Sequence, residues 1–420
     1  MHDHPALAAA AAGARDLVPL FCLDDLPGPH SPARQVFLLE SLRDLDGSLR
    51  ARGGALVVRR GETVRETVEL ARRVGASAVH LSEDVSAFAQ QRARRLADAL
   101  ARERIALHLH PGVTIVPPGD LAPADRDHFL VFTPFWRRWS SAPRRLVLPP
   151  PGRISLPEGL SPPAGVSTSP GHSLLPGGEG PARVRLETWL GNGLSRYAEL
   201  RDDLAADATS HLGAYLHLGC LSPLELESRT SSQGEAFARQ LCWRDFYHQL
   251  LAARPSLSHE DLRPARHEWA EPGELLDAWL EGSTGYPLVD AAMRQLGAEG
   301  TMPNRARLVV ASFLTKTLRL DWRLGARAFA ERLLDGDVAS NSGNWQWVAG
   351  TGTDTRPHRV LSPTRQAHRF DPDGAYVRRH VPELASIDGP HVHEPWRLGL
   401  LRPDGYPKRL VVHEEALARP

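Results

Sequence analysis

The sequence has little cysteine and no long apolar run. Its three cysteines, Cys22, Cys220 and Cys242, are far apart and include no CxxC pair, which argues against a disulfide framework or a zinc site and favours a reducing, cytoplasmic location. No segment approaches the roughly 20 apolar residues that a bilayer-spanning helix needs. The alanine run at 6–12 follows Asp3 and no basic leader, so it predicts a helix rather than a signal peptide. We expect a cytoplasmic protein with no membrane role.

An excess of charge of either sign is also lacking. The 50 lysine and arginine residues balance 50 aspartate and glutamate residues, and the formal net charge is +0 at pH 7. This balance argues against a protein that coats nucleic acid by bulk electrostatics, but it allows a local basic groove. Nearly all the cations are arginine, since Lys316 and Lys408 are the only lysines.

The first third of the chain alternates short apolar runs with helical patterns. The expected strands are at 17–21, 55–58, 78–81 and 106–109, and the expected helices are at 35–50, 63–74 and 86–102. Strands separated by helices indicate parallel pairing through right-handed crossovers. Residues 1–125 therefore predict an α/β domain with a doubly wound parallel sheet.

Composition changes twice after this domain. Residues 126–181 contain runs of proline, glycine and serine, such as those at 149–152 and 176–178, which sustain neither a helix nor a β-ladder. We interpret this stretch as an interdomain linker. From residue 182 to 420 helical periodicity dominates, so we expect a second domain that is all-α.

Most of the ten tryptophans fall in the helical domain. Core filling is the default interpretation for any single indole. Trp345 and Trp347, however, stand among small polar residues, and Asp335, Gly336 and Asp337 lie just upstream. Glycine frees the backbone between the two carboxylates, so this stretch is the first candidate for a functional site.

The stretch "DGDVASNSGNWQWVAGTGTD" at Asp335 resembles the signature of the DNA photolyase and cryptochrome family. Further similarity lies in "CWRDFYHQLL" at Cys242, "EGSTGYPLVDAAMRQL" at Glu281, "TMPNRARLVVASFL" at Thr301, "FDPDGAYVRRHVPEL" at Phe370 and "HEPW" at His393. Among family members the chain is most similar to the class I cyclobutane pyrimidine dimer photolyases. The resemblance implies a monomer that binds FAD in its helical domain, with a second antenna chromophore of unknown identity.

The same resemblance implies the activity. It is light-driven repair of cyclobutane pyrimidine dimers in DNA, by electron transfer from excited reduced FAD to a flipped-out dimer. Three tryptophans match those that pass electrons from the surface to the flavin: Trp269, Trp322 and Trp345.

The resemblance also implies which residues hold FAD. Those along the phosphates are Tyr197, Thr209, Ser210, His211, Leu212 and Gly213, and the others are Arg244, Arg307, Asp335, Gly336, Asp337 and Asn341. Arg307 is expected to pair with Asp335, and Asn341 to face the flavin N5. Gly213 replaces a serine of the family, so one hydroxyl donor to phosphate is lost. Helix capping is the alternative role for Asp335 and Asp337.

On the DNA side the resemblance implies aromatic walls, amides and arginines around the lesion. The residues are Arg201, Gln240, Trp243, Asn304, Arg305 and Trp347. Gln240 stands where dimer photolyases usually carry glutamate, and glutamine occurs there in enzymes that act on the (6-4) photoproduct. Those enzymes use histidines near the position of Asn304, and residues 303–307 contain none. We therefore keep the cyclobutane dimer as the expected substrate.

The N-terminus departs from the family pattern. Residues 2–7, "HDHPAL", resemble the family's first helix, but the strand that precedes this helix is missing. A sheet without that strand would expose apolar faces and unpaired backbone groups, so we expect the natural product to begin upstream of Met1. Gln90 and Gln91 stand where folate-binding relatives carry an Asn-Glu pair, which leaves a deazaflavin, a flavin mononucleotide or no antenna.

Three other functions remain open from the sequence. The first is a cryptochrome, a light receptor on the same fold that does not repair DNA. The second is repair of the (6-4) photoproduct. The third is a helical DNA-binding protein without flavin, or a degenerate family member with structural roles only.

Overall fold

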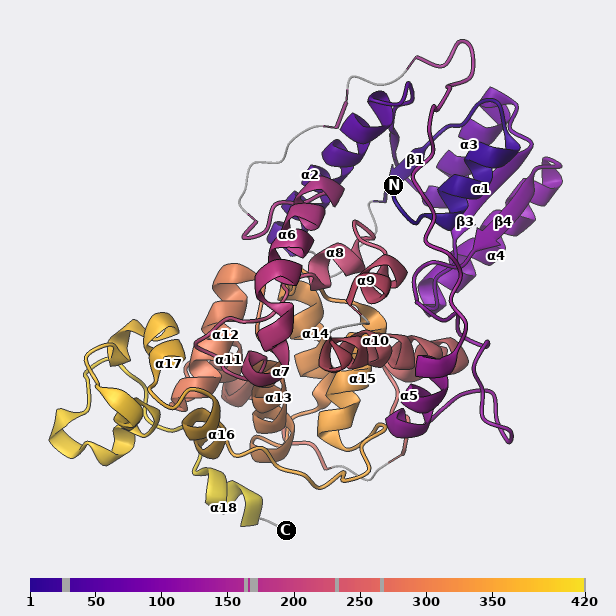
Figure 1. The fold of residues 1–420 in the computed structure, drawn as a ribbon. Coiled ribbons are helices and arrows are strands. Elements are labelled where there is room, and N and C mark those ends of the chain that lie inside the picture. Colours follow the sequence, from indigo (N-terminus) through magenta and orange to yellow (C-terminus); the bar gives the residue numbers. More distant parts are fainter. Residues whose placement is uncertain (25–30, 162–164, 167–172, 231–233, 265–267, 419–420) are drawn as a thin grey trace. The chain divides into compact units, whose positions relative to one another are not determined.

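The computed structural model describes residues 1–24, 31–161, 165–166, 173–230, 234–264 and 268–418 (Figure 1). The chain divides into two compact units. The first comprises Met1–Gly191 and His211–Ser256, and the second comprises Asn192–Ser210 and Leu257–Pro420. The predicted linker therefore belongs to the first unit, as does part of the segment predicted as the helical domain.

The α/β part of the first unit follows the predicted order of elements. Its helices are α1 (Pro5–Gly13), α2 (Pro32–Arg50), α3 (Thr63–Val74) and α4 (Ala87–Arg102), and its strands are β1 (Leu20–Leu23), β2 (Val57–Arg60), β3 (Ala78–Ser82) and β4 (Ala106–His110). Local sequence explains the boundaries: Ser86 caps α4 by accepting from Ala89 N at 3.2 Å, and α3 ends at Gly75, whose φ is +64°.

The strands form two separate parallel sheets rather than one. β1 pairs with β2, and β3 pairs with β4. Among the described residues, each of the four strands therefore has one edge that pairs with no strand. Each sheet has its own apolar cluster: one includes Leu42, Leu49 and Leu56, and the other includes Leu96 and Leu100. Parallel pairing is confirmed, but the expected single sheet is divided.

The remaining regular elements described in the first unit are helices. They include α5 (Phe132–Ser141), α6 (Glu179–Asn192), α8 (Gly213–His217), α9 (Pro223–Thr230) and α10 (Glu235–Ala253). Asp245 of α10 is buried and accepts hydrogen bonds from Trp139 Nε1 of α5 at 2.8 Å and from the backbone N–H groups of Ile115 and Val116 at 3.0 Å. The predicted linker is thus not free of helix, because α5 packs on α10 through this carboxylate.

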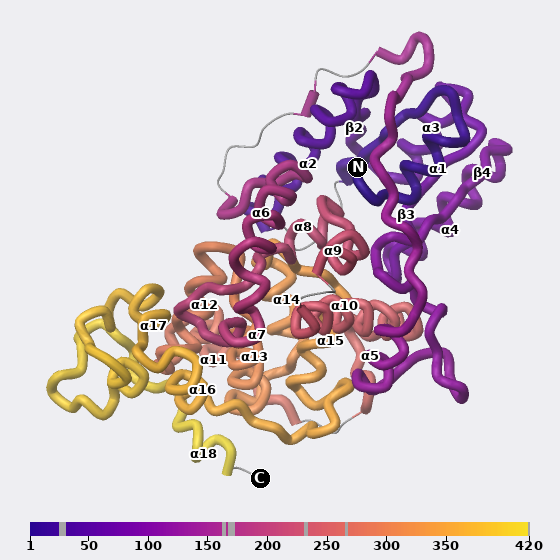
Figure 2. Tube along the Cα trace, viewed as in Figure 1, coloured from indigo at the N-terminus to yellow at the C-terminus, as the bar shows by residue number. Residues whose placement is uncertain are grey.

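Every regular element described in the second unit is helical (Figure 2). The α-helices are α7 (Tyr197–Leu200), α11 (Gly273–Glu281), α12 (Pro287–Glu299), α13 (Asn304–Ser312), α14 (Trp322–Arg332), α15 (Val338–Ala349), α16 (Pro363–Phe370), α17 (Ala375–His380) and α18 (His413–Ala418). A π-helical segment (Phe313–Thr317) follows α13. The 3-10 turns are η1 (Leu194–Arg196), η4 (Pro382–Leu384), η5 (Gly389–His393), η6 (Pro395–Arg397) and η7 (Gly399–Leu401), and η2 (Pro255–Ser258) crosses the boundary between the units.

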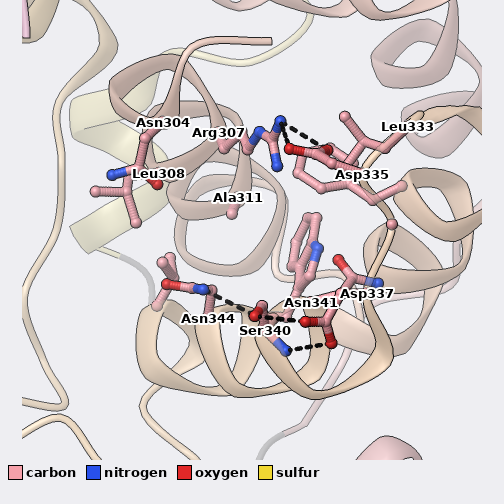
Figure 3. Close-up of a pocket in the computed structure, with 14 residues that line it drawn as sticks. Asn304, Arg307, Leu308, Ala311, Leu333, Asp335, Asp337, Ser340, Asn341 and Asn344 are labelled. Carbon is pink, nitrogen blue, oxygen red and sulfur yellow. Dashed lines mark hydrogen bonds and ion pairs between the residues drawn. The ribbon is translucent and has the colours of Figure 1, made fainter. Parts of the chain in front are cut away.

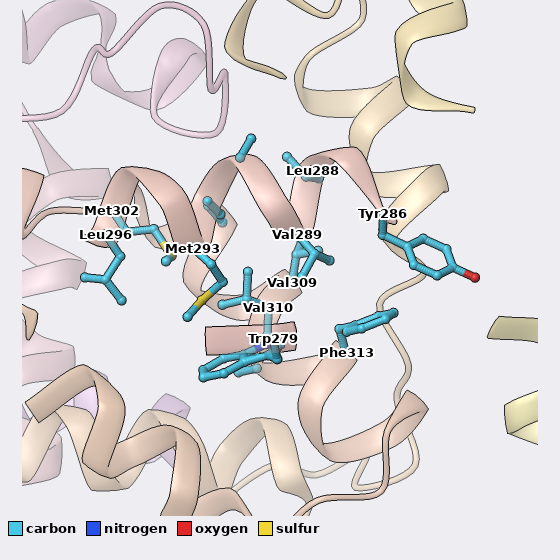
Figure 4. Close-up of a cluster of buried hydrophobic side chains, with 14 of the residues drawn as sticks. Trp279, Tyr286, Leu288, Val289, Met293, Leu296, Met302, Val309, Val310 and Phe313 are labelled. Atoms are coloured by element: carbon cyan, nitrogen blue, oxygen red, sulfur yellow. The ribbon is translucent and has the colours of Figure 1, made fainter. Parts of the chain in front are cut away.

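Helix α12 forms the centre of the second unit. Its residues are apolar on almost every side, which is typical of a helix that other helices surround. Figure 4 shows Val289 and Met293 of α12 pointing toward Trp279 of α11 and Val310 of α13. None of the described helices has the length and apolar composition to cross a bilayer.

Candidate functional site

A pocket in the second unit collects many of the residues singled out in the sequence (Figure 3). It is formed by α13, α14, α15 and the turn before α15. Its lining residues are Asn304, Arg307, Leu308, Ala311, Phe329, Leu333, Asp335, Gly336, Asp337, Ser340, Asn341, Asn344, Trp345 and Val348. We call it the α13–α15 pocket.

An ion pair joins α13 to the turn before α15. Arg307 Nη2 lies 3.0 Å from both carboxylate oxygens of Asp335, and Arg307 Nε donates to Met302 O at 2.8 Å. The predicted ion pair is therefore present. Nη1 of Arg307 makes no hydrogen bond to the described residues, which leaves its N–H donors for an anionic ligand group.

Asp337 caps helix α15. Its Oδ1 accepts from the N–H groups of Ala339 and Ser340 at 2.7 and 3.2 Å, and its Oδ2 accepts from Ser340 Oγ at 3.0 Å. This satisfies N–H groups that a helix start leaves without partners. The capping role considered from the sequence is confirmed for Asp337, and the capped end of α15 lies in the pocket wall.

Asn341 is held in one orientation by the neighbouring helix. Its Nδ2 donates to Ala326 O of α14 at 2.8 Å. Its Oδ1 accepts no hydrogen bond from the described residues, so it is an acceptor at the pocket surface for a ligand N–H. Figure 3 shows Ser340, Asn341 and Asn344 of α15 on the side of the pocket opposite the Arg307–Asp335 pair.

Trp345 forms the apolar floor of the pocket. Its ring lies edge-on to Phe329, with centroids 5.0 Å apart, and to Trp279, at 6.1 Å. Gly325 of α14 faces the ring so closely that a Cβ at that position would overlap it. Trp345 Nε1 is buried and has no hydrogen-bond partner among the described residues. A buried donor without a partner is costly, so it is a further polar group that a ligand could satisfy.

The other two tryptophans of the predicted electron path share a core with Trp345. Trp322 is fully buried and donates from Nε1 to Asp261 Oδ1 at 2.9 Å. Trp269 is only partly buried and packs against the same apolar cluster. The three indoles therefore range from a pocket-lining residue to one that solvent reaches.

Several predicted cofactor residues lie outside the pocket lining. Tyr197 is beside Arg201, and burial raises its pKa to about 12. Thr209 and Ser210 belong to the second unit, whereas His211, Leu212 and Gly213 belong to the first and lead into α8. Arg244 also lies in the first unit, where Nη1 donates to Val113 O.

The predicted DNA-side residues are divided between the units. In the second unit, exposed Asn304 lines the pocket, and Arg305 pairs with Asp202 at 3.0 Å and lies over the Phe370 ring. In the first unit, Gln240 and Trp243 are both on α10.

Two partners of the predicted aromatic walls were missed in the sequence. Phe132 stacks on Trp243 at 3.7 Å, with ring planes 2° apart. The guanidinium of Arg359 lies 5.0 Å from the centroid of Trp347. Neither contact has a local sequence signal, because 110 and 11 intervening residues separate the partners.

Comparison with known proteins gives a uniform result. A family model described as "FAD binding domain of DNA photolyase" matches residues 237–419, and one described as "DNA photolyase" matches residues 1–153. The deoxyribodipyrimidine photo-lyase of Streptomyces griseus is 47% identical, covering 100% of this chain and 95% of the relative. The enzyme of that name from Escherichia coli is 34% identical, covering 99% and 94%.

Solved structures agree. A bacterial class III photolyase from Agrobacterium tumefaciens superposes with a TM-score of 0.92 at 31% identity, covering 100% of this chain and 93% of that one. A Synechocystis cryptochrome gives 0.91 at 28% identity, and an archaeal photolyase from Sulfolobus tokodaii with two FAD molecules gives 0.88 at 28%; both cover 99% of this chain and 95% of theirs.

The contact between Gly325 and Trp345 generates a stability prediction. Gly325→Ala is expected to lower the free energy of unfolding by about 1–3 kcal/mol, because the added methyl group overpacks the pocket floor. Gly297→Ala is the matched control, because Gly297 is exposed in α12 and a Cβ there would meet open space. This substitution should raise the free energy of unfolding by about 0.5–1 kcal/mol. Urea denaturation measures both. Equal stabilisation by the two alanines would contradict the close packing.

Proposed function

This chain belongs to the DNA photolyase family, and from that premise we propose that it repairs cyclobutane pyrimidine dimers in DNA in a light-driven reaction. The observation that carries the proposal is the α13–α15 pocket, which combines an ion pair, a capped helix start, an amide acceptor and a buried indole. The acting form is proposed to be a cytoplasmic monomer bound to damaged DNA.

FAD is the cofactor that the family model names, and the donor set of the pocket fits it. Arg307, Asp335, Asp337 and Asn341 would hold it. Arg307 offers unused N–H donors for negatively charged oxygens, and Asn341 offers an unused carbonyl oxygen for an N–H group. When bound and reduced, FAD would supply a light-absorbing electron donor for splitting the dimer, a reaction with no net change in oxidation state.

The remaining cofactor residues are proposed by position. Tyr197, Thr209, Ser210, His211, Leu212, Gly213 and Arg244 would lie along the phosphates and the rest of the cofactor. Gly213 is the first residue of α8, where a backbone N–H can donate in place of the missing hydroxyl.

Three indoles of the chain would carry electrons to the flavin. Trp345 lines the pocket, Trp322 is buried in the same core, and Trp269 is partly exposed. The burial of Trp345 and Trp322 and the partial exposure of Trp269 support a path from solvent to the pocket. Trp279 is an equally buried neighbour of Trp345 that the proposed path does not use.

On the substrate side, a dimer must leave the DNA stack to reach a pocket. Asn304 stands at the pocket with an exposed amide, suited to hydrogen-bonding a base edge. Trp347 and Trp243 would provide aromatic surfaces, and Gln240 an amide, while Arg201 and Arg305 would contact backbone phosphates. Because Arg305 already pairs with Asp202, a phosphate would have to compete with that carboxylate.

A second chromophore is also proposed, without a chemical identity. The Sulfolobus tokodaii photolyase contains two FAD molecules, which implies a novel light-harvesting cofactor in that protein. In this chain Gln90 and Gln91 lie on α4, and the Gln90 amide donates to Val85 O at 3.1 Å.

Two alternative functions have specific support. The similarity to a Synechocystis cryptochrome supports a light receptor on the same fold. Gln240 supports repair of the (6-4) photoproduct, although residues 303–307 lack histidine.

A repair assay separates these alternatives. Protein with reduced FAD is mixed with an oligonucleotide carrying one thymine cyclobutane dimer and exposed to blue light. We expect loss of the dimer, measured by chromatography, and no loss in the dark. A matched oligonucleotide with a (6-4) photoproduct should stay unchanged. No dimer splitting by flavin-loaded, reduced protein would disprove the proposal.

Photoreduction tests the proposed electron path. Trp322→Phe should abolish light-driven reduction of bound oxidised FAD in the presence of an external reductant, because the path is interrupted at its buried middle member. Trp279→Phe removes another buried indole beside Trp345 and should leave photoreduction near the wild-type rate. FAD content, measured by absorbance, checks that both variants fold. Wild-type photoreduction in Trp322→Phe would rule out this path.

A further inference from the structure

A second pocket lies near the C-terminal end of the second unit and shares no residue with the α13–α15 pocket. Its lining residues are Gly285, Pro395, Trp396, Arg402, Pro407, Lys408, Arg409 and Val412. We call it the basic pocket. It involves the GSTGYP and HEPW sequences, to which the proposed function gives no role.

The lining carries three positive charges and no carboxylate. Glu394, next to the lining residue Pro395, pairs with His368 and Arg397, and none of the described carboxylates pairs with Arg402, Lys408 or Arg409. A concave surface with one sign of charge concentrates the field and attracts counter-ions. The lining of the basic pocket therefore holds three cations that form no ion pair with a described carboxylate.

A buried carboxylate fixes the geometry of the pocket. Asp290 is fully buried and accepts from Thr284 N at 2.7 Å, Thr284 Oγ1 at 2.6 Å, Gly285 N at 3.0 Å and Tyr406 Oη at 2.6 Å. These bonds tie the loop before α12 to the segment that carries the cations. Both walls of the pocket are thus held by the same side chain.

Further contacts fix the cationic segment. Gly285 has φ +77°, and a Cβ there would lie 2.6 Å from Arg409 N, so only glycine allows this approach. Leu410 N donates to Thr284 O at 2.9 Å. The Arg409 guanidinium lies 4.5 Å from the Trp396 ring centroid. The backbone that carries the charges is therefore positioned before any ligand arrives, which lowers the cost of binding.

We propose that the basic pocket binds a phosphate group. Guanidinium groups match phosphate oxygens in charge and in the direction of their N–H donors, and an ammonium adds a compact third charge. The phosphate can belong to a small molecule or to the backbone of DNA, and binding measurements with each separate these sources. The proposal stands independently of the repair activity.

The lysine content of the chain provides a direct assay. Lys408 is exposed, whereas Lys316 donates to Ala349 O at 2.6 Å and Pro357 O at 3.0 Å, and these are the only lysines. Acetylation of the full-length holoprotein is followed by mass spectrometry with increasing inorganic phosphate. Lys408 should be protected and Lys316 unchanged. Sodium chloride at equal ionic strength should give less protection.

Charge-removal variants give the second readout. Arg402→Gln and Arg409→Gln should each weaken inorganic phosphate binding about tenfold or more, measured by calorimetry, because each removes charge-assisted hydrogen bonds. Arg327→Gln is the matched control, since Arg327 is exposed on α14 and outside the basic pocket. If either pocket variant fails to fold, Lys408→Gln takes its place, because it changes only an exposed side chain. This variant should also weaken inorganic phosphate binding.

Undamaged duplex DNA distinguishes the source of the phosphate. If DNA backbone occupies the pocket, Lys408→Gln should reduce the slope of log affinity against log salt by about 0.9, whereas Arg327→Gln should not. An unchanged slope together with protection by inorganic phosphate assigns a small phosphate-bearing ligand. Absence of both protection and a slope change would overturn the proposal.

Discussion

The ion pair between Arg307 and Asp335 is the interaction on which the α13–α15 pocket depends. Asp335 lies in the turn before α15, and Arg307 lies on α13. The pair therefore holds α13 and the start of α15 on either side of the pocket. Loss of either partner would leave a half-buried charge without its counter-ion, which costs more than loss of a solvated surface pair. The turn directs the capped start of α15 toward the pocket, and this places Asn341 and Trp345 on its wall.

Asp337 illustrates how structural and proposed binding roles meet in one side chain. Both carboxylate oxygens already accept hydrogen bonds from the first turn of α15. Each carboxylate oxygen has more than one acceptor direction, so a ligand contact would add to the cap without replacing it. Asp290 has a comparable structural role at the basic pocket. Its buried carboxylate fixes a loop and thereby positions charged side chains that it does not contact.

Sequence periodicity was sufficient for the elements of the α/β part, because a period of two or of 3.6 residues is a local property. Helix α3 was predicted with its observed bounds. Division of the strands into two sheets was not predicted, since pairing depends on which strands are present across the whole domain. The family resemblance singled out Arg307, Asp335, Asn341 and Trp345 as site residues from the sequence, and all four line the α13–α15 pocket.

Contacts between residues distant in the sequence could not be predicted in this way. The stacking of Phe132 on Trp243 and the close approach of Gly325 to Trp345 depend on how helices pack. No pattern around Gly325 indicates that a ring lies opposite. The same limit applies to Arg305, whose partner Asp202 lies 103 residues earlier.

The central claim is that the α13–α15 pocket binds FAD, and equilibrium binding of FAD to the apoprotein tests it most directly. The wild-type chain should bind FAD in this pocket, and Arg307→Gln should weaken that binding about tenfold or more, because a charge-assisted donor is lost. Arg327→Gln, which changes an exposed arginine outside the pocket, should bind as the wild type does. Unchanged FAD affinity in a folded Arg307→Gln variant would contradict the account.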